Sequence, residues 1–547
     1  MMTEHKIWPI KGGVHPDFNK DCSTQTPITK ATLPDTIVIP VAQHIGEIGH
    51  IIVDVGQTIH KGQPLTDLPE GLGVITHAST SGTIIAIEER DVPHSSGLQA
   101  TCVVIDVDGK DDWGEFKRDP ILDYDQTDTM HLCGRIRRSG LVGMGGAAFP
   151  FAAKLAATRE GAVKTLIING VECEPYISCD DMLMRTYADE IIQGIKILLY
   201  ILKPEECLIG IEDNKPLAIE ALQKAQQDLD VAVDIVSIPT IYPSGDEKQL
   251  IRILTGKKLK KTDLTFDHGI LMHNVATVRS VFRAVIHGEP LISRIVTVTG
   301  RGISKPQNFE APIGTPIEHL VKLAGGYTDQ AERLLIGGPM MGFPVKSDAL
   351  PIIKAMNCIL VAPTQDLPYS MDMAMPCIRC GQCADACPVD LLPQQLYWHA
   401  KAREFDKTET YQLFDCIECG CCAYVCPSDI PLVAHYRFAK SEIRNERDKQ
   451  KKIDLARERF DFHEFRKERD KRERDEKRAK HKAALQKKKA SGSNDKQAAI
   501  KAAMERAKAK KTQQTNAPKN TDNLTPAQQK QIDEAEQRRQ QKPRDTE

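Results

Sequence analysis

The sequence predicts a multidomain chain of mixed α/β and β architecture. Its 547 residues are too many for a single hydrophobic core, so several domains are expected. Short strand-like runs dominate the first part, strands and helices alternate in the middle, and two cysteine-rich runs and a charged tail follow. With 41% hydrophobic residues and a net charge of −2, the composition is ordinary for a globular protein and gives no global reason to expect nucleic acid as a partner.

Residues 33–115, after an extension of residues 1–32, are predicted to form an all-β domain. The runs "TIVIPVAQHIG", "HIIVDVGQTIHKGQPL" and "GTIIAIEE" have strand composition and are separated by turn residues. This pattern resembles the barrel-sandwich domains that carry a lipoyl or biotinyl group on a lysine at the domain tip. Here the tip runs from His77 to Gly82 and contains no lysine, so the sequence favours a scaffold role.

Residues 116–285 alternate between strand and helix patterns, which is typical of a parallel α/β sheet. The apolar runs "KTLIIN", "CLIGIED" and "VAVDIVSIP" have strand length. Residues 180–202 and 216–227 have helical periodicity, and Pro216 suits a first helical turn. In such sheets the ligand binds at the carboxyl ends of the strands.

Three further regions complete the predicted organisation: a small β domain at 286–350, a region at 365–440 that holds the cysteine runs, and a charged tail at 441–547. The tail alternates acidic and basic residues, which predicts a solvated helix that fades into disorder. The longest apolar segment, Ile191 to Leu202, is too short to span a bilayer, and the N-terminus has no signal-peptide pattern. A chain without membrane spans is therefore expected.

The two cysteine runs, "CIRCGQCADACP" from Cys377 and "CIECGCCAYVCP" from Cys416, share the spacing C-x2-C-x2-C-x3-C-P. This is the spacing of two-cluster bacterial ferredoxins, in which the fourth cysteine of each run ligates the other cluster. Zinc is the alternative, but a zinc site explains neither the third cysteine, nor the proline, nor the repeat. Cys421 lies off the repeat and is predicted to be a spare thiol. The predicted ligands of two [4Fe-4S] clusters are Cys377, Cys380, Cys383 and Cys426 for one, and Cys416, Cys419, Cys422 and Cys387 for the other.

A glycine-rich segment, "SGLVGMGGAAFPFAAKL", begins at Ser139. Its glycines allow backbone N–H groups to face an anion, although a tight packing turn is the alternative. The acidic segment "GVECEPYISCDD" follows a predicted strand, and "YPSGDEKQLI" repeats the pattern of a glycine and two acids before a helix. Acidic side chains at a strand end suit ribose hydroxyls and the edges of nicotinamide or flavin rings, whereas a solvated turn is the alternative.

The segments "VGMGGAAFP", "NGVECEP", "YPSGDEKQ" and "HNVATV", together with "GGVHP" and the cysteine runs, resemble the C subunit of the Rnf-type (Rsx-type) ion-translocating electron transport complex. They are more distantly similar to the flavin-bearing NADH-oxidising subunit of respiratory complex I, from whose pattern Val171 and Asp246 depart. The resemblance covers roughly Gly12 to Lys440. It implies FMN over the glycine loop, NAD(H) beside it, a β-grasp (SLBB-like) domain at 286–350 and an α-helical two-cluster ferredoxin-like domain. The cofactor-binding residues that it implies are Gly143, Gly145, Gly146, Asn169, Glu172, Glu174, Gly245, Asp246, Glu247 and Asn274.

The function implied by the resemblance is that of a peripheral subunit of a membrane-bound translocase at the cytoplasmic face of the bacterial inner membrane. Hydride exchange at FMN would be followed by single-electron transfer through the two clusters. The implied partners are other subunits, among them a ferredoxin-like iron–sulfur subunit, and no side chain is required as a general acid or base. One alternative is a cluster-only electron-wiring module that binds no nucleotide, for example serving to reduce a redox sensor. A nucleic-acid-binding redox sensor ranks low, because the acidic residues of the tail would oppose phosphate.

Overall fold

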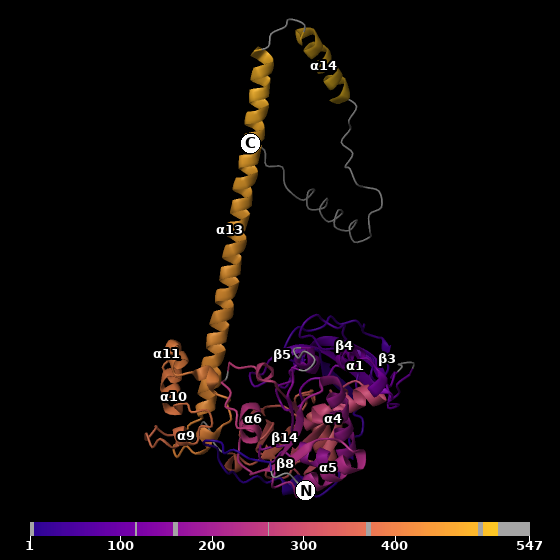
Figure 1. Ribbon diagram of the computed structural model, residues 1–547, viewed down its shortest axis with the longest axis vertical. Coiled ribbons are helices and arrows are strands. Elements are labelled where there is room, and N and C mark those ends of the chain that lie inside the picture. Colours follow the sequence, from indigo (N-terminus) through magenta and orange to yellow (C-terminus); the bar gives the residue numbers. More distant parts are fainter. Residues whose placement is uncertain are drawn as a thin grey trace. The chain divides into compact units, whose positions relative to one another are not determined.

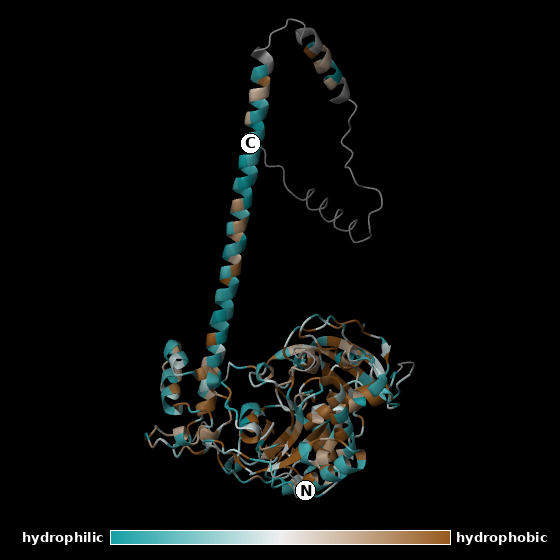
Figure 2. Cartoon of the chain, in the orientation of Figure 1, coloured by the Kyte–Doolittle hydropathy of each residue, from teal (hydrophilic) through white to brown (hydrophobic). Residues whose placement is uncertain are grey.

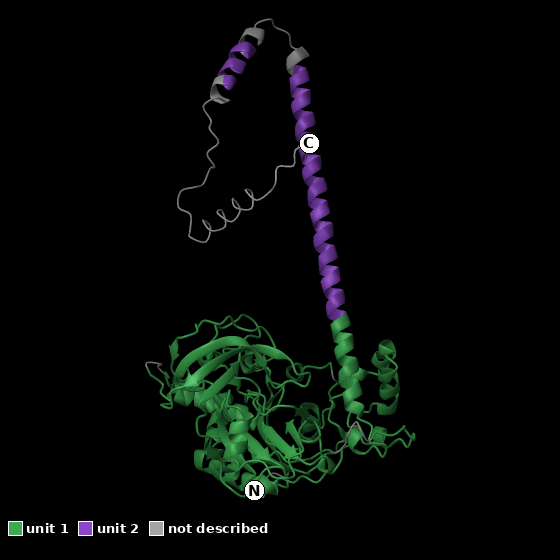
Figure 3. Cartoon of the chain, turned by 180° about the vertical axis from the view of Figure 1, so that it is seen from behind, with its two compact units in different colours: residues 1–446 green, residues 447–547 purple. Residues whose placement is uncertain are grey.

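The computed structural model describes residues 5–114, 118–156, 162–260, 262–367, 374–490 and 496–511. Residues 1–446 form one compact unit and residues 447–547 a second (Figure 3). The first unit contains three sheets with helices packed around them, followed by the helical cysteine-rich region (Figure 1). This mixture of β, α/β and helical parts is the predicted fold class.

The first domain is built on an antiparallel sheet with the order β2-β5-β4-β3. Its strands are β2 (Thr36–Pro40), β5 (Gln99–Val107), β4 (Gly82–Asp91) and β3 (Thr58–Ile59). The predicted tip is buried, and within it the Ser79 hydroxyl donates a hydrogen bond to the Ile313 carbonyl at 2.6 Å. The tip is thus a packing surface against a neighbouring domain, as expected of a scaffold.

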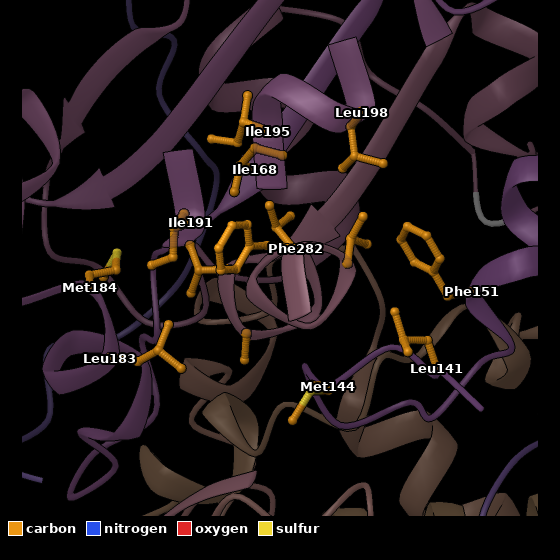
Figure 4. Close-up of a cluster of buried hydrophobic side chains, with 14 of the residues drawn as sticks. Leu141, Met144, Phe151, Ile168, Leu183, Met184, Ile191, Ile195, Leu198 and Phe282 are labelled. Atoms are coloured by element: carbon orange, nitrogen blue, oxygen red, sulfur yellow. The ribbon is translucent and has the colours of Figure 1, made fainter. Parts of the chain in front are cut away.

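The central sheet is parallel throughout, with the order β8-β7-β6-β9. Its strands are β8 (Asp234–Ile238), β7 (Glu206–Glu212), β6 (Thr165–Asn169) and β9 (Ile270–Asn274). Alternate residues face opposite sides, so Ile168 packs on α4 and α7 whereas Ile167 packs on the side of α6. Figure 4 shows Ile168 with the side chains of α4 and of Phe282 around it.

The helices of this domain are α3 (Cys179–Thr186), α4 (Ala188–Leu202), α5 (Pro216–Leu229), α6 (Glu247–Thr255) and α7 (Val275–Phe282), with α1 (Thr129–Arg138) and α2 (Phe151–Ala156) preceding the sheet. The single helix predicted over 180–202 is in fact two, because the backbone leaves helical geometry at Tyr187. Pro216 stands in the first turn of α5, as predicted.

The third sheet extends beyond the predicted boundaries of 286–350 on both sides. Its order is β1-β11-β10-β14-β12-β13. The strands are β1 (Thr29–Lys30), β11 (Gln307–Pro312), β10 (Ser293–Thr299), β14 (Cys358–Ala362), β12 (Arg333–Ile336) and β13 (Phe343–Val345), and α8 (Ile317–Leu323) packs on them. Strand β1 comes from the N-terminal extension and pairs in parallel with β11, while β14 pairs in parallel with β10. Parallel partners are distant in sequence, so hydrophobic runs do not reveal them.

The cysteine-rich region contains the short helices α9 (Gln382–Asp385), α10 (Pro393–Lys401), α11 (Phe405–Thr410) and α12 (Cys421–Tyr424). Helix α13 (Leu432–Ala490) begins before the predicted tail boundary at 441, and α14 (Lys496–Lys511) follows it. Ile443 of α13 is buried in the hydrophobic core of the cysteine-rich region, so the first turns of α13 belong to that region. Hydrophilic residues run along the rest of α13 (Figure 2), and the disorder predicted for the end of the chain falls on residues outside the described ranges.

Among the described helices, none combines the length and the apolar character that a bilayer crossing requires.

Truncation after Glu446 is expected to leave the melting temperature within about 2 °C of that of the full chain, because the described side chains from 447 to 487 bury almost no surface. Differential scanning calorimetry and an iron count would test this. Truncation after Lys440 is the informative contrast, since it removes Ile443 from the core and should lower the melting temperature. Equal melting temperatures for the two truncations would contradict the assignment of Ile443 to the core.

Candidate functional site

A cavity of about 780 Å³ opens at the carboxyl ends of β6 and β9. It is lined by residues of the α/β domain, of the third sheet's domain and of the cysteine-rich region, and by Pro93 of the first domain. The ten residues that the sequence assigned to cofactor binding all line this cavity. They are Gly143, Gly145, Gly146, Asn169, Glu172, Glu174, Gly245, Asp246, Glu247 and Asn274. The structure thus brings the predicted residues together, although their individual roles stay predictions.

The glycine loop presents bare backbone to the cavity. A Cβ atom placed on Gly146 would meet no atom within 4 Å, and the nearest atoms to one placed on Gly145 would be those of Asn274, at 3.4 Å or more. Gly146 also has a φ of +110°, a conformation that L side chains rarely adopt. The space that a side chain would fill here belongs to the cavity, so the loop fits a ligand that approaches the backbone closely, as the phosphate of FMN would.

The start of the loop is held by the buried side chain of Lys354. Its Nζ atom donates hydrogen bonds to the carbonyl of Gly140 at 2.8 Å and to the carbonyl of Ile75 at 3.2 Å. Burial lowers the pKa of Lys354 to about 7. The ammonium group therefore ties the glycine loop to the barrel-sandwich domain, which explains why the loop needs that scaffold.

Lys154 and His273 line the cavity but were not predicted from the sequence. The Lys154 ammonium, on α2, lies 3.0 Å from the carboxylate of Glu247, so this predicted cofactor-binding residue already has a cationic partner. The His273 ring packs against Phe151, and burial holds its pKa well below the usual range, so the imidazole is neutral. A lysine one helical turn beyond a glycine loop was the signal that could have revealed Lys154.

Glu172 uses its carboxylate within the protein. Its two oxygens accept hydrogen bonds from the backbone N–H groups of Asp180 at 2.6 Å and Asp181 at 3.2 Å, in the first turn of α3. The residue has a φ of +50°, an unusual conformation for glutamate. The buried Lys20 ammonium stabilises this conformation by binding the Glu172 carbonyl at 2.7 Å. Glu172 thus shapes the cavity wall and caps a helix.

Glu174 is the acidic residue best placed to meet a ligand. Its Oε1 atom accepts hydrogen bonds from the backbone N–H groups of Met340 at 2.7 Å and Met341 at 3.0 Å. The Oε2 atom is buried and makes no hydrogen bond. Burial also raises the pKa of Glu174. A buried acceptor without a partner beside a cavity is consistent with a ligand that supplies the missing donor.

The remaining predicted polar residues cap helices or brace loops. Asp246 accepts hydrogen bonds from the first turn of α6, and Asn274 accepts one from the first turn of α7. The Asn169 amide donates to the Gly245 carbonyl at 2.9 Å, which joins two of the predicted segments. These contacts give the cavity wall a defined shape before any ligand binds.

The eight predicted cluster ligands surround two further cavities in the cysteine-rich region. One, of about 280 Å³, is lined by Cys377, Cys380, Cys383 and Cys426, and the other by Cys387, Cys416, Cys419 and Cys422. Each set takes three thiols from one run and the fourth from the other run, which is the arrangement that the spacing predicts. A set of four converging thiols suits an iron–sulfur cluster.

The two runs have the same backbone conformation. Positive φ angles occur at equivalent positions, at Arg379 (61°) and Glu418 (59°) and again at Gly381 (86°) and Gly420 (83°). Cys421 lies outside both thiol sets, buried in a hydrophobic cluster with Tyr242, as a spare thiol would be. The repeat seen in the sequence is therefore a repeat in structure.

The two thiol sets differ in their surroundings. All four cysteines of the second set are buried, and burial raises the pKa of the Cys416 thiol to about 11. Cys380 of the first set is exposed. Cys419 lines both the second thiol cavity and the large cavity, and its carbonyl accepts a hydrogen bond from the Tyr242 hydroxyl at 2.6 Å. The second set therefore borders the large cavity, whereas the first set reaches the surface.

The segment "GGVHP" packs against the second thiol set. The backbone N–H of Gly13 donates to the Ala386 carbonyl at 3.0 Å, and Val14 forms an antiparallel bridge with Tyr242. A Cβ atom on Gly12 would lie 2.7 Å from the Ala386 oxygen and 2.8 Å from the carbonyl carbon of Cys387. Only glycine allows the N-terminal segment to pass this close to a predicted ligand.

Four family profiles match the chain in the predicted order. They are the RnfC barrel sandwich hybrid domain at 8–110, the Nuo51 FMN-binding domain at 136–283, the SLBB domain at 295–344 and the 4Fe-4S dicluster domain at 376–430. The C subunit of the ion-translocating oxidoreductase complex of Yersinia pestis bv. Antiqua (strain Antiqua) is 50% identical over 442 residues, which are 80% of this chain and 70% of that protein. The chain belongs to the C-subunit family of ion-translocating oxidoreductase complexes.

Another member of this family, from Vibrio cholerae serotype O1 (Classical Ogawa 395), is 49% identical over 513 residues. The match covers 93% of this chain but 65% of the Vibrio protein, so the chain spans slightly less than two thirds of that relative's length. A solved NAD+-reducing [NiFe]-hydrogenase in its H2-reduced state aligns with 57% of this chain and 63% of its own, at 18% identity and a TM-score of 0.44. The matched domains confirm FMN and [4Fe-4S] clusters as the cofactors, and the relation to complex I through the Nuo51 domain.

If the thiol sets are crossed, Cys387→Ala and Cys416→Ala should weaken the same cluster signal, although they lie in different runs. Cys377→Ala should instead match Cys426→Ala. Low-temperature EPR of the reduced proteins would distinguish the two groups, with Cys421→Ala as the control that retains both clusters. Grouping of Cys387→Ala with Cys377→Ala would refute the crossed arrangement.

Gly12→Ala should selectively damage the cluster of the second set, because the added methyl group meets the backbone at Cys387. Gly97→Ala is a matched control. The two glycines have nearly the same φ, +64° and +62°, but a Cβ on Gly97 meets nothing within 4 Å. Both variants therefore carry a similar conformational strain of about 1–2 kcal/mol, and only Gly12→Ala adds a clash. Equal iron content and EPR spectra for the two variants would contradict this contact.

Proposed function

We propose that this chain transfers electrons between NAD(H) and ferredoxin-like carriers within a membrane-bound complex that couples this transfer to ion translocation. The observation that carries the proposal is the position of Cys419, which lines both the large cavity and the second thiol cavity. A ligand in the large cavity would thus lie directly beside a predicted cluster ligand. Such adjacency suits electron transfer and has no purpose in a simple binding domain.

The residues around the large cavity are proposed to hold FMN and to receive NAD(H). The backbone of Gly143, Gly145 and Gly146 would bind the phosphate, with Lys154 as the nearby cation. FMN supplies the exchange between two-electron hydride chemistry and single-electron steps. The protein binds and orients the reactants and excludes water, with no side chain required as a general acid or base in hydride exchange.

The proposed acidic and polar contacts come from the carboxyl edge of the sheet. Glu174 offers its unpartnered oxygen, and Asn169 and Asn274 brace the wall. Glu172, Asp246 and Gly245 support the site through their bonds within the protein, and Glu247 acts through its pairing with Lys154.

The different burial of the two thiol sets indicates the order in which electrons would pass through the two clusters. Cys387, Cys416, Cys419 and Cys422 would hold the cluster next to the flavin cavity. Cys377, Cys380, Cys383 and Cys426 would hold the cluster that exchanges electrons with a partner, because Cys380 is exposed. The proposed partners are other subunits of the complex, including a ferredoxin-like iron–sulfur subunit, with this chain bound peripherally at the cytoplasmic face of the inner membrane.

The alternative, a cluster-only wiring module, predicts no flavin in the isolated protein. The glycine backbone facing open cavity space favours the flavin-binding function instead.

Gly145→Val should lower the FMN content of the anaerobically purified protein at least about tenfold and leave the iron content unchanged, because the side chain fills the space beside the loop. Gly134→Val is the control in the same domain, since a Cβ there meets only the end of Arg138. Acid-extracted flavin and iron would be counted in each protein. NADH should reduce the clusters of the wild type, seen by EPR, but not those of Gly145→Val. Cluster reduction by NADH in a flavin-free protein would favour a different route, and a wild type without flavin would favour the wiring module.

A further inference from the structure

Asp180 is an acidic residue of the cavity wall that the proposed function has not used. It stands in the first turn of α3, and its Oδ2 atom accepts a hydrogen bond from the Asn274 amide at 2.6 Å. Its carboxylate, the Glu172 carboxylate and the Cys179 thiol have ligand atoms that all lie within 4.8 Å of one another. Two carboxyl groups this close in a poorly solvated place favour holding one proton between them.

The two carboxyl groups differ in the contacts that they make within the protein. Glu172 is tied to two backbone N–H groups and to the Lys20 ammonium, which lies 3.9 Å away. Asp180 has no such cationic contact at hydrogen-bond distance among the described residues, and its bond from Asn274 can be kept with the carboxyl in either protonation state. Asp180 is therefore the member of the pair that changes its protonation.

Charged and titratable groups from several elements face Asp180. They are Glu172 of the acidic loop, Lys20 of the N-terminal segment, Arg294 of β10 and Cys179 of α3. Asp181 is paired with Arg185 at 2.5 Å and does not line the cavity. Loss of solvation and the Glu172 carboxylate raise the pKa of Asp180 to about 7, which outweighs the opposing effect of Asn274, Arg294 and Lys20.

Other acidic groups of the cavity are less suited to this exchange. Glu247 is paired with Lys154, and Asp246 caps α6. Glu174 accepts two backbone hydrogen bonds on one oxygen, which favours its ionised form, although burial opposes this. Glu174 is the other acidic residue that could bind the additional proton, so an experiment has to distinguish it from Asp180.

We propose that Asp180 is the redox-linked proton site of the flavin cavity. The inference rests on the proposed function. A hydride brings two electrons and one proton, so its delivery adds one negative charge to the cavity. The Asp180 carboxylate then binds one further proton from solvent and neutralises that charge. When the two electrons leave, one to each [4Fe-4S] cluster, the charge disappears, and both protons are released. The sum is NADH and two oxidised clusters giving NAD+, two reduced clusters and one proton.

The test is a redox titration of the flavin in the anaerobic holoprotein between pH 5.5 and 8.5, with the absorption of the flavin-free Gly145→Val protein subtracted to remove the cluster signals. One additional proton per two electrons makes the midpoint potential fall more steeply, by about 30 mV per pH unit. In the wild type this steeper region should begin near pH 7, where oxidised protein loses the Asp180 proton.

Asp180→Asn keeps the shape of the side chain and should abolish the steeper region while the protein still binds FMN. Asp181→Asn is the matched control, one residue along the same helical turn, and should keep the steeper region. Asp180→Glu should also keep it, because the carboxyl group is retained.

A steeper region that persists in Asp180→Asn, or that disappears in Glu174→Gln instead, would overturn the proposal. The proposal would also be overturned if the midpoint potential of the wild type showed no steeper region, and this outcome does not depend on whether the variants fold. If the wild type binds no FMN, the proposed function and this inference fail together. If it binds FMN and Asp180→Asn behaves like the wild type, only the inference fails.

Discussion

The acidic wall of the cavity depends on the Lys20 ammonium group, which is buried among backbone carbonyls. Its Nζ atom donates hydrogen bonds to the carbonyls of Glu172 at 2.7 Å and Glu174 at 2.9 Å, and also to that of Ile177. A buried cation is costly unless it is fully hydrogen-bonded, and burial accordingly lowers the pKa of Lys20. These hydrogen bonds fix the shape of the loop between β6 and α3, including the positive φ angles of Glu172 and Tyr176. The direction of Glu172 and the unpartnered oxygen of Glu174 both follow from this shape.

Lys20 belongs to the N-terminal extension, so that extension is part of the site. Further along, the same segment adds strand β1 to the third sheet, and earlier it passes over Cys387 at Gly12. One stretch of fewer than thirty described residues thus contacts the α/β domain, the β-grasp sheet and the cysteine-rich region. The domains recognised from sequence patterns are consequently not independent units, since the cavity needs all of them to close its wall.

Burial gives the two thiol sets different roles. The set that contains Cys419 is buried and lies against the large cavity, whereas the set that contains Cys380 reaches solvent. Solvent exposure and hydrogen bonds to the sulfur atoms tune the reduction potential of iron–sulfur clusters. In the buried set, the backbone N–H groups of Leu391 and Glu418 donate to the sulfur atoms of Cys387 and Cys416, each at 3.4 Å. Two sequence repeats with the same cysteine spacing therefore lie in different surroundings.

The sequence by itself determined the features that arise from local spacing. The parallel strands β6, β7 and β8, helix α5 with its proline start, and the sharing of thiols between the cysteine runs were all predicted, because periodicity and ligand spacing act over a few residues. The set of residues around the large cavity was also predicted, from motifs that resemble a known family. Asn274 and Asp246 cap helices through contacts with residues only two or three positions along the chain. Tertiary structure decided the other roles: Glu247 pairs with Lys154, and Lys354 and Lys20 fix the loops, through contacts between residues up to more than two hundred positions apart. Electrostatic and hydrogen-bonding partners of this kind depend on distance in space, which no spacing along the chain encodes.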